Sequence, residues 1–175
     1  MKNKAIIHII TGDGKGKTTA ALGLALRAIG ANKKVKIIQF MKKPIFSEHK
    51  AIKKYNLPIE IEAYGIGFYK ILGDKHTQKE HELSCQKALD ATQKVIASQK
   101  YDLLILDEIN VAMSSKLIDE TKTIEILQQA TNCDIVLTGR GATKKIIALA
   151  DLVSVIKKEK HYFDQGLGAR KGIEF

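Results

Sequence analysis

The stretch HIITGDGKGKTTAALGLALRAIG, residues 8–30, limits what this chain can fold into more than any other part of the sequence. An apolar run, a glycine-rich turn and a pattern of helical period follow one another, in the order of a phosphate-binding loop between a strand and a helix. Glycines let successive backbone N–H groups point at one anion, and the helix start adds the positive end of its dipole. The residues expected to form this nucleotide-binding loop are Gly12, Asp13, Gly14, Lys15, Gly16, Lys17, Thr18 and Thr19.

The loop departs by one residue from the pattern G-x-x-x-x-G-K-[ST]. Thr11 stands where the first glycine belongs, and Gly12 leaves only three residues before Gly16. The context still favours phosphate binding over a glycine-rich helix start without a ligand. Lys17 offers a point charge to the phosphates, and Thr18 places a hydroxyl where Mg²⁺ (or Mn²⁺) sits in such sites.

Apolar runs rich in β-branched residues alternate along the chain with patterns of helical period. Since parallel strands need crossover helices, we expect an α/β, P-loop NTPase-like fold, a doubly wound and mainly parallel sheet with helices on both faces. The length of 175 residues suits one domain over residues 1–175. The expected strands are 5–10, 35–40, 103–107, 133–139 and 152–157, with a short one at 59–64. The expected helices are 17–30, about 77–99, about 121–131 and 143–150.

The run LLILDEIN, residues 103–110, ends an expected buried strand in two carboxylates. Acidic residues at a strand tip beside a phosphate loop hold Mg²⁺ directly or through water, so we expect a metal site of Thr18, Asp107 and Glu108. The alternative is a helix start, with Asp107 as the cap. Arg140, in TGRGA after another strand, is expected at the same sheet edge as a cation for the nucleotide, with a solvent salt bridge as the alternative.

Two further segments are irregular. Residues 41–76 include GIGFYKILGDK, a glycine-bearing stretch that follows an expected strand, and such stretches carry ligand contacts in α/β sheets. The tail, residues 160–175, holds three glycines and three aromatic residues, which argue against a disordered end.

The net charge of +10 raises the possibility of nucleic-acid binding. The lysines form scattered pairs without a dense run, so a solvated lysine surface is favoured and no nucleic-acid partner is expected. Cys85 and Cys133 lack metal-site spacing and are expected to be free thiols. No run approaches the roughly 18–20 apolar residues of a membrane span, and the N-terminus leads directly into the loop. We therefore expect a cytoplasmic protein without a membrane partner.

Several segments together resemble the P-loop type cob(I)alamin (corrinoid) adenosyltransferases. The resemblance runs in order from about residue 5 to residue 175, and its most specific part is the tail pattern KH.FD.G..A.KGIE. The other matching segments are TGDGKGKTTAALGLALRAIG, VKIIQFMK, LLILDEINVAM, IVLTGRGA and LADLVSVIK.

The resemblance implies that the bond broken is not a phosphoryl bond. In this family a reduced corrinoid, as Co(I), attacks the 5′ carbon of the ribose of ATP, and triphosphate leaves. Co(I) is itself a strong nucleophile, so the protein must align the reactants and neutralise the leaving group. Lys17, Thr18 and Glu108 are the catalytic residues that the resemblance implies, with Lys15 and Mg²⁺ assisting. The family also holds the nucleotide in reverse, with its terminal phosphate deep in the loop.

The resemblance further assigns residues outside the loop. Arg27 matches a family arginine and is expected to contact ATP. Gly67 and Phe68 match an aromatic loop over the corrinoid, where many relatives read G-F-T-W and this chain reads G-F-Y-K; the second aromatic is either displaced to Tyr69 or lost. Phe163 and Asp164 are the expected corrinoid contacts of the tail. His161 is expected to be structural, because reaction at Co(I) needs a weakly ligated metal.

Other functions remain as alternatives to corrinoid adenosylation. A P-loop kinase or ATPase would release ADP or phosphate, a nucleic-acid-binding ATPase would show salt-dependent affinity, and a corrinoid chaperone would bind without turnover. The resemblance also implies a homodimer and a reduced flavoprotein as the electron donor.

Overall fold

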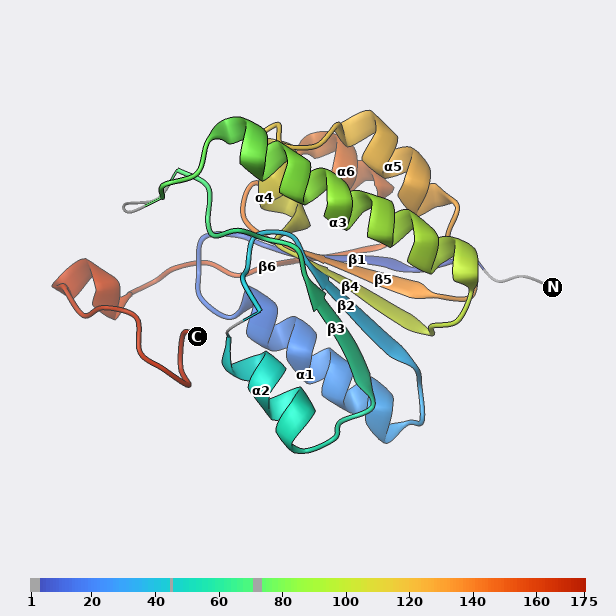
Figure 1. Ribbon diagram of the computed structural model, residues 1–175, viewed down its shortest axis with the longest axis horizontal. Helices are drawn as coiled ribbons and strands as arrows, with labels where there is room; N and C mark the ends of the chain where they lie inside the picture. Colours follow the sequence, from blue (N-terminus) through green and yellow to red (C-terminus); the bar gives the residue numbers. More distant parts are fainter. Residues whose placement is uncertain (1–3, 45, 71–73) are drawn as a thin grey trace.

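A computed structural model describes residues 4–44, 46–70 and 74–175 of the chain. Its six strands form one sheet in the order β3-β2-β4-β5-β1-β6, and every neighbouring pair is parallel (Figure 1). The strands are β1 Ile7–Thr11, β2 Val35–Gln39, β3 Ile59–Ala63, β4 Leu103–Asp107, β5 Asp134–Thr138 and β6 Leu152–Val155.

Helices cover both faces of this sheet. Figure 1 shows α3, α4, α5 and α6 on one face and α1 and α2 on the other. The helices are α1 Lys17–Gly30, α2 Ser47–Lys54, α3 Gln78–Ser98, α4 Ile109–Ser114, α5 Glu120–Gln128 and α6 Lys144–Leu149, followed by the 3-10 helix η1 Tyr162–Gln165. The doubly wound α/β fold expected from the sequence is confirmed.

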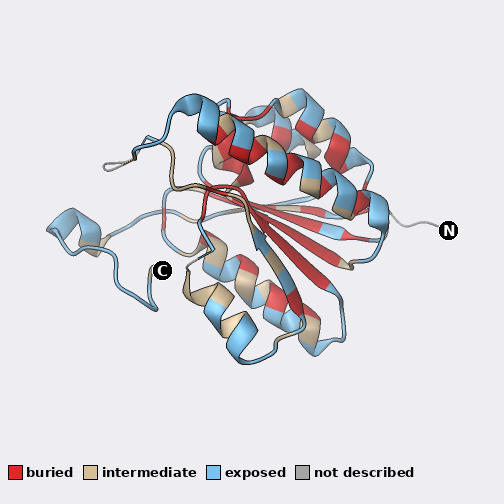
Figure 2. Cartoon of the chain, in the orientation of Figure 1, coloured by how far each residue is buried: buried red, intermediate tan, exposed pale blue. Residues whose placement is uncertain are grey.

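The core lies on the two faces of the four central strands. Every residue of β2 and β4 is buried, and Figure 2 shows the middle of the sheet as the most buried part of the chain. Apolar side chains of β4 alternate between the two layers: Leu104 and Leu106 pack under α3, while Leu103 and Ile105 pack against α1. Strands buried on both faces read as continuous apolar runs, which is why the sequence locates them well.

The expected helices at 17–30 and about 77–99 are present almost to the residue. A capping box starts α3, because the Thr77 hydroxyl accepts a bond from the Glu80 amide while the Glu80 carboxylate accepts one from the Thr77 amide. Helix α2 lies in the segment expected to be irregular, and its bounds were not predicted. No residue of α2 is buried, so it lacks the apolar stripe from which a helix is read.

Two other expectations concern the thiols and the membrane. Cys85 and Cys133 are both buried and free, as the sequence predicts. Among the described residues, no helix is long and apolar enough to cross a bilayer.

Beyond β6 the tail turns back toward the sheet edge where the strands end. Figure 1 shows it leaving the body of the fold through η1 and returning beside the start of α2. There the Ser47 hydroxyl donates a hydrogen bond of 2.8 Å to the backbone carbonyl of Phe175. The returning tail therefore reaches the carboxyl ends of the parallel strands, where such sheets bind ligands.

Candidate functional site

The loop between β1 and α1 needs glycine at three positions. Gly12 and Gly16 have φ angles of 100° and 117°, a region that side chains rarely adopt. Gly14 has no such constraint, but its amide donates a 2.8 Å hydrogen bond to the carbonyl of Ile156 beyond β6. A Cβ atom on Gly14 would lie 2.6 Å from the carbonyl oxygen of Lys157. Ile156 and Lys157, which follow β6, thus hold the phosphate loop in position.

The start of α1 is left open for an anion. Gly16 provides no side-chain cap, and the first turn of α1 holds no acidic residue. Lys17 is buried, and its ammonium donates 2.7 Å hydrogen bonds to the carbonyls of Gly12 and Gly14. Burial lowers the pKa of Lys17, while the charge of Glu108 opposes that shift. Amides and an ammonium at one helix end form a phosphate site.

Asp107, at the tip of β4, is the centre of a buried hydrogen-bond network. Its Oδ1 accepts bonds from the hydroxyls of Thr18, at 2.8 Å, and Thr138, at 2.7 Å. Its Oδ2 accepts bonds from the amide of Gln39 and the ammonium of Lys42, both at 3.0 Å. Four neighbours therefore fix a carboxylate that is 1% exposed. The sequence paired Thr18 with Asp107, and the structure brings them into contact.

Lys42 follows β2 and is also buried. Besides Asp107, its ammonium lies 3.3 Å from Oε1 of Glu48 and 3.2 Å from the hydroxyl oxygen of Thr18. Gln39 donates to the same Glu48 oxygen at 3.1 Å. Neither Lys42 nor Glu48 was predicted, because their partners come from other strands and helices.

Glu108 occupies an unusual backbone position just before α4, with a φ angle of 63°. Burial, followed by the neighbouring charge of Asp107, raises the pKa of Glu108 to about 7. The charges of Lys42, Lys17 and Arg140 oppose the rise. A carboxyl whose pKa lies near neutrality because of burial and a charged neighbour is typical of functional sites.

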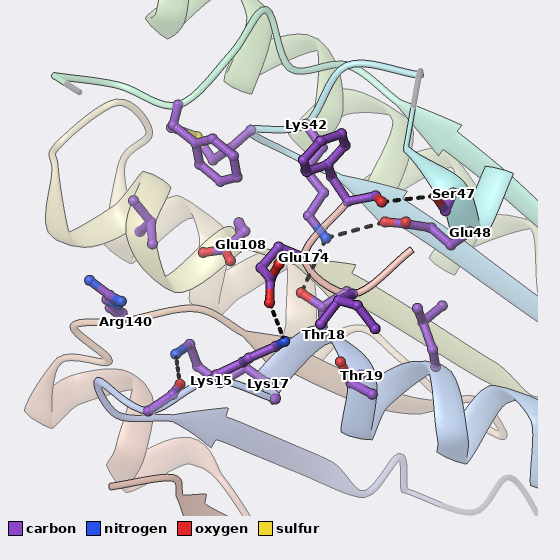
Figure 3. Close-up of a pocket in the computed structure, with 18 of the residues that line it drawn as sticks. Lys15, Lys17, Thr18, Thr19, Lys42, Ser47, Glu48, Glu108, Arg140 and Glu174 are labelled. Carbon is purple, nitrogen blue, oxygen red and sulfur yellow. Dashed lines mark hydrogen bonds and ion pairs between the residues drawn. The ribbon is translucent and has the colours of Figure 1, made fainter. Parts of the chain in front are cut away.

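Lys17, Thr18, Lys42, Glu48 and Glu108 line one cavity of about 660 Å³ at the ends of the strands (Figure 3). Of the expected site residues nearby, Gly12, Asp13 and Asp107 are not part of its lining. Its floor is the loop from Gly14 to Thr19, and Glu108, Arg140 and Lys42 project into it. Arg140 donates a 3.3 Å hydrogen bond to the carbonyl of Asp13 and so lies at the same sheet edge as the phosphate loop, where the sequence placed it. The cavity is rich in positive charge where a polyphosphate would lie.

Phe68 and Tyr69 line another wall of the same cavity. The Phe68 ring meets the Phe46 ring edge to face, with centroids 6.5 Å apart. The Tyr69 ring packs on His81, 5.2 Å away, and its hydroxyl donates to Gln78. Tyr69 therefore lines the same wall as Phe68. This is the position to which the sequence allowed the second aromatic residue to be displaced.

The tail closes the cavity from outside. Gly172, Ile173, Glu174 and Phe175 all line it. The Glu174 carboxylate lies 2.6 Å from the ammonium of Lys15 and also accepts bonds from the Tyr162 hydroxyl and the Arg170 amide. These contacts, with that of Lys15 first, lower the pKa of Glu174 to about 2. Neither the Glu174 contact nor that of Ser47 with Phe175 has a local sequence signal.

Other expected site residues lie away from the cavity lining. Arg27 is in the last turn of α1 and is exposed, remote from the loop at the start of that helix. Phe163 is 69% exposed in η1, and Asp164 forms a 2.9 Å ion pair with Lys158. Gly67 precedes the aromatic wall and does not itself line the cavity. The structure does not bring these side chains together with the phosphate loop.

His161 lines the cavity, but its contacts are structural. Its Nδ1 accepts a 3.1 Å hydrogen bond from the amide of Phe163 and so caps η1. Its ring also packs against Tyr162. This geometry supports the structural role expected from the sequence.

The oxygen ligands present suit a hard divalent cation that shares its coordination with phosphate. Thr18, Asp107 and Glu108 offer a hydroxyl and two carboxylates. Within the described ranges, no group of three or more His, Cys, Asp or Glu residues is arranged to hold a metal by itself. Mg²⁺ commonly binds through one or two protein ligands, with phosphate oxygens and water completing the shell. The residues therefore fit Mg²⁺ bound together with a nucleotide.

Comparison with known proteins gives a consistent match along the chain. Residues 3–175 match the family described as ATP:corrinoid adenosyltransferase BtuR/CobO/CobP. The chain is 30% identical to the corrinoid adenosyltransferase of Escherichia coli K12, over 98% of this chain and 86% of that protein. It is 29% identical to the corrinoid adenosyltransferase CobA of Salmonella typhimurium LT2, over 99% of this chain and 87% of that protein.

Solved structures resemble the chain in fold. The flagellar accessory protein FlaH of Methanocaldococcus jannaschii aligns with a TM-score of 0.57 at 10% identity, over 89% of this chain and 72% of that one. The KaiC-like protein PH0186 of Pyrococcus horikoshii aligns with a TM-score of 0.53 at 18% identity, over 90% of this chain and 74% of that one. At these identities the likeness concerns the arrangement of strands and helices alone.

Proposed function

We propose how this chain works from the premise that it belongs to the ATP:corrinoid adenosyltransferase family. Members transfer the 5′-deoxyadenosyl group of ATP to the Co(I) of a reduced corrinoid. The Co(I) electron pair forms the cobalt–carbon bond at C5′. The bond from C5′ to oxygen breaks, and the electron pair of that broken bond leaves with triphosphate. ATP and a corrinoid are thus the substrates, and the finer proposal is that the corrinoid is cob(I)alamin.

The phosphate loop binds the triphosphate and stabilises it as it leaves. Lys17 and the first amides of α1 bind phosphate oxygens, and Lys15 and Arg140 add positive charge from the two sides of the loop. Lys17 helps to neutralise the negative charge that grows on the triphosphate as it leaves. Its burial supports this role, because a charge interaction is stronger where water is excluded.

Thr18, Asp107 and Glu108 hold Mg²⁺ in this proposal. The ion, when bound, supplies positive charge to the triphosphate oxygens. Thr18 and Asp107 keep fixed positions through their mutual hydrogen bond, and Glu108 binds as a carboxylate after losing its proton. The loss of that proton couples metal binding to pH.

The observation that carries the proposal is that one cavity is lined by both the phosphate loop and the aromatic pair Phe68 and Tyr69. ATP bound on the loop would present its ribose toward that aromatic wall, where a flat corrinoid ring can stack. The protein thereby brings C5′ and cobalt together, which removes much of the entropic cost of the reaction. Arg27, Gly67, Phe163 and Asp164 remain proposed contacts.

We further propose a cytoplasmic homodimer supplied with electrons by a reduced flavoprotein. Residues that lie outside the cavity of one subunit, such as Phe163 with its 69% exposed side chain, are then available to a neighbouring subunit.

The decisive experiment is an anaerobic absorbance assay with ATP, Mg²⁺ and chemically reduced corrinoid. We expect the Co(I) spectrum to disappear, a light-sensitive adenosyl product to form, and triphosphate to appear in equal amount. Parallel assays with cob(I)alamin and cob(I)inamide test the proposed substrate, and a higher kcat/KM for cob(I)inamide would contradict it. ADP or phosphate without a change in the corrinoid would contradict the chemistry.

Lys17→Ala and the exposed Lys33→Ala form a matched pair for the same assay. Removing the buried charge should lower kcat/KM by about 100-fold or more, whereas Lys33 lies after α1, outside the cavity lining. Equal activities of the two variants would remove Lys17 from the mechanism.

A further inference from the structure

Lys42 holds a position that a divalent cation would also require. Its ammonium lies 3.0 Å from Oδ2 of Asp107. It also lies 3.2 Å from the hydroxyl oxygen of Thr18 and 3.3 Å from Oε1 of Glu48 (Figure 3). The first two of these residues are proposed metal ligands. An ammonium on these oxygens leaves little room for a second cation beside them.

The site around Lys42 is buried and well connected. Side-chain exposure is 9% for Lys42, 1% for Asp107 and 13% for Glu48. Gln39 donates to both carboxylates and holds them around the ammonium. Burial alone would lower the pKa of Lys42, but the charges of Asp107 and Glu48 raise it above its ordinary value. The Lys42 ammonium thus faces two carboxylates.

The Lys42 ammonium also borders open space into which it can move, because the residue lines the cavity. Lys42 lies beside the phosphate loop and opposite Arg140, and its ammonium lies 5.4 Å from the centre of the Phe46 ring. A lysine side chain has a flexible stem of four carbons and an ammonium with three donors, so its head can move while the stem stays packed. Triphosphate oxygens bound near Thr18 would be acceptors for the displaced ammonium.

We propose that Lys42 and a divalent cation compete for the oxygens of Thr18 and Asp107, and that binding of the metal with a nucleotide transfers the Lys42 ammonium to the triphosphate. The proposal rests on the proposed function, because it takes a triphosphate as the ligand of the loop. Lys42 thus opposes metal binding on its own and favours metal binding together with triphosphate. Two cations within a few ångströms repel each other strongly at a buried site, whereas a polyanion relieves the repulsion.

The first test measures metal affinity without nucleotide or corrinoid. Mn²⁺ is titrated into the protein and free Mn²⁺ is followed by electron paramagnetic resonance. Lys42→Met should bind Mn²⁺ at least about fivefold more tightly than the wild type, because the competing charge is gone. Lys43→Met, at the exposed next residue, is the matched control and should equal the wild type. Equal Mn²⁺ affinity of Lys42→Met and the wild type would overturn the proposal.

The second test measures the other half of the exchange. Calorimetric titration with inorganic tripolyphosphate and saturating Mg²⁺ should give an affinity at least about fivefold weaker for Lys42→Met than for the wild type. Tighter Mn²⁺ binding with unchanged tripolyphosphate affinity would also overturn the proposal, since Lys42 would then be a fixed counter-charge. If the wild type bound no tripolyphosphate at all, the proposed function and the transfer of Lys42 to triphosphate would both be contradicted. Competition between Lys42 and the metal would then be decided by the Mn²⁺ titration.

A third measurement needs no loss of the buried charge and covers the case in which Lys42→Met does not fold. The ¹⁵N-labelled lysine ammonium groups of the wild type are observed by NMR, and the Lys42 signal is identified by its absence in Lys42→Arg. Mg²⁺ with tripolyphosphate should shift this signal, whereas Mg²⁺ alone should shift it much less. A Lys42 signal that stays in place when tripolyphosphate binds would contradict the transfer.

Discussion

The hydroxyl of Thr18 donates a hydrogen bond of 2.8 Å to Oδ1 of Asp107, so the first turn of α1 is tied to the tip of β4. The bond links the two motifs that the sequence assigns to one metal site. Asp107 in turn accepts a bond from Thr138 on β5. The phosphate loop and the carboxylate edge of the sheet therefore form one connected unit.

Removal of this bond should weaken metal-dependent nucleotide binding. Thr18→Ala loses both a proposed metal ligand and the partner of Asp107, and affinity for ATP with Mg²⁺ should fall by about 10-fold or more. Thr18→Ser keeps the hydroxyl and should retain the affinity. Calorimetric titrations with Mg²⁺ and with EDTA separate the two contributions: a loss of equal size in both conditions would contradict a metal role.

Replacing glycine by alanine should change the free energy of unfolding in opposite directions at two positions, Gly14 and Gly23. A Cβ atom on Gly14 meets the carbonyl oxygen of Lys157 at 2.6 Å, so Gly14→Ala should lower the free energy of unfolding by about 1–3 kcal/mol and disturb the loop. Gly23, within α1, has nothing within 4 Å of the added atom, and Gly23→Ala should raise the free energy of unfolding by about 0.5–1 kcal/mol. Urea unfolding of both variants checks this, and changes of the same sign would contradict it.

Glu108 should make the metal-free protein less stable as the pH rises. Its folded pKa of about 7 exceeds the ordinary value of 4.5, because burial and the charge of Asp107 disfavour the carboxylate. Between these two pKa values the folded state holds more protons than the unfolded state, so the contribution of Glu108 to stability is present below about pH 4.5 and is lost as the pH rises through about 7.

Glu108→Gln, which cannot ionise, should therefore melt about 2–4 °C higher than the wild type at pH 8 in EDTA, with little difference at pH 4.5. The same variant should lose adenosyltransferase activity, because it removes a proposed metal ligand. Thermal melts at both pH values test this, and a difference that does not depend on pH would show that the carboxyl is not destabilised by its surroundings.

Phe68 should matter to the corrinoid and not to the nucleotide. Its ring lines the cavity and packs on Phe46. Phe68→Ala should slow the reaction with cob(I)alamin by about tenfold through lost stacking and alignment, while the Kd for ATP stays unchanged. Tyr55→Ala, at a ring 65% exposed at the end of α2, is the control. An effect of Phe68→Ala on ATP affinity alone would place the ring on the nucleotide.

Most of the fold is predictable because its signals are local. The strands of the sheet are continuous apolar runs, and α1 and α3 carry long patterns that begin at recognisable starts, Lys17 after Gly16 and Gln78 after Thr77. Helix α2 is the exception. It is short, follows Pro44, and buries no residue, so nothing in its own sequence sets it apart from a loop.

The candidate site divides in the same way. Lys17, Thr18 and Asp107 belong to compact motifs, and the fold brings them together at one sheet edge because parallel strands end there. Lys42 and Glu174 become part of the site only through partners far along the chain, such as Asp107 and Lys15, and pairs of that kind leave no pattern in one sequence. Arg27 has a motif match and no place at the cavity, because ten residues of helix separate it from the loop.

The place of β1 in the sheet has a consequence for how the protein is made. This strand lies between β5 and β6, with His8 opposite Val136 on one side and Leu152 on the other. During synthesis β1 leaves the ribosome well before either of its neighbours, β5 and β6, has been made. The hydrogen bond from the Gly14 amide to the Ile156 carbonyl likewise forms only after Ile156 has been synthesised. A nascent chain therefore cannot complete its phosphate loop before β6 and Ile156 have been synthesised.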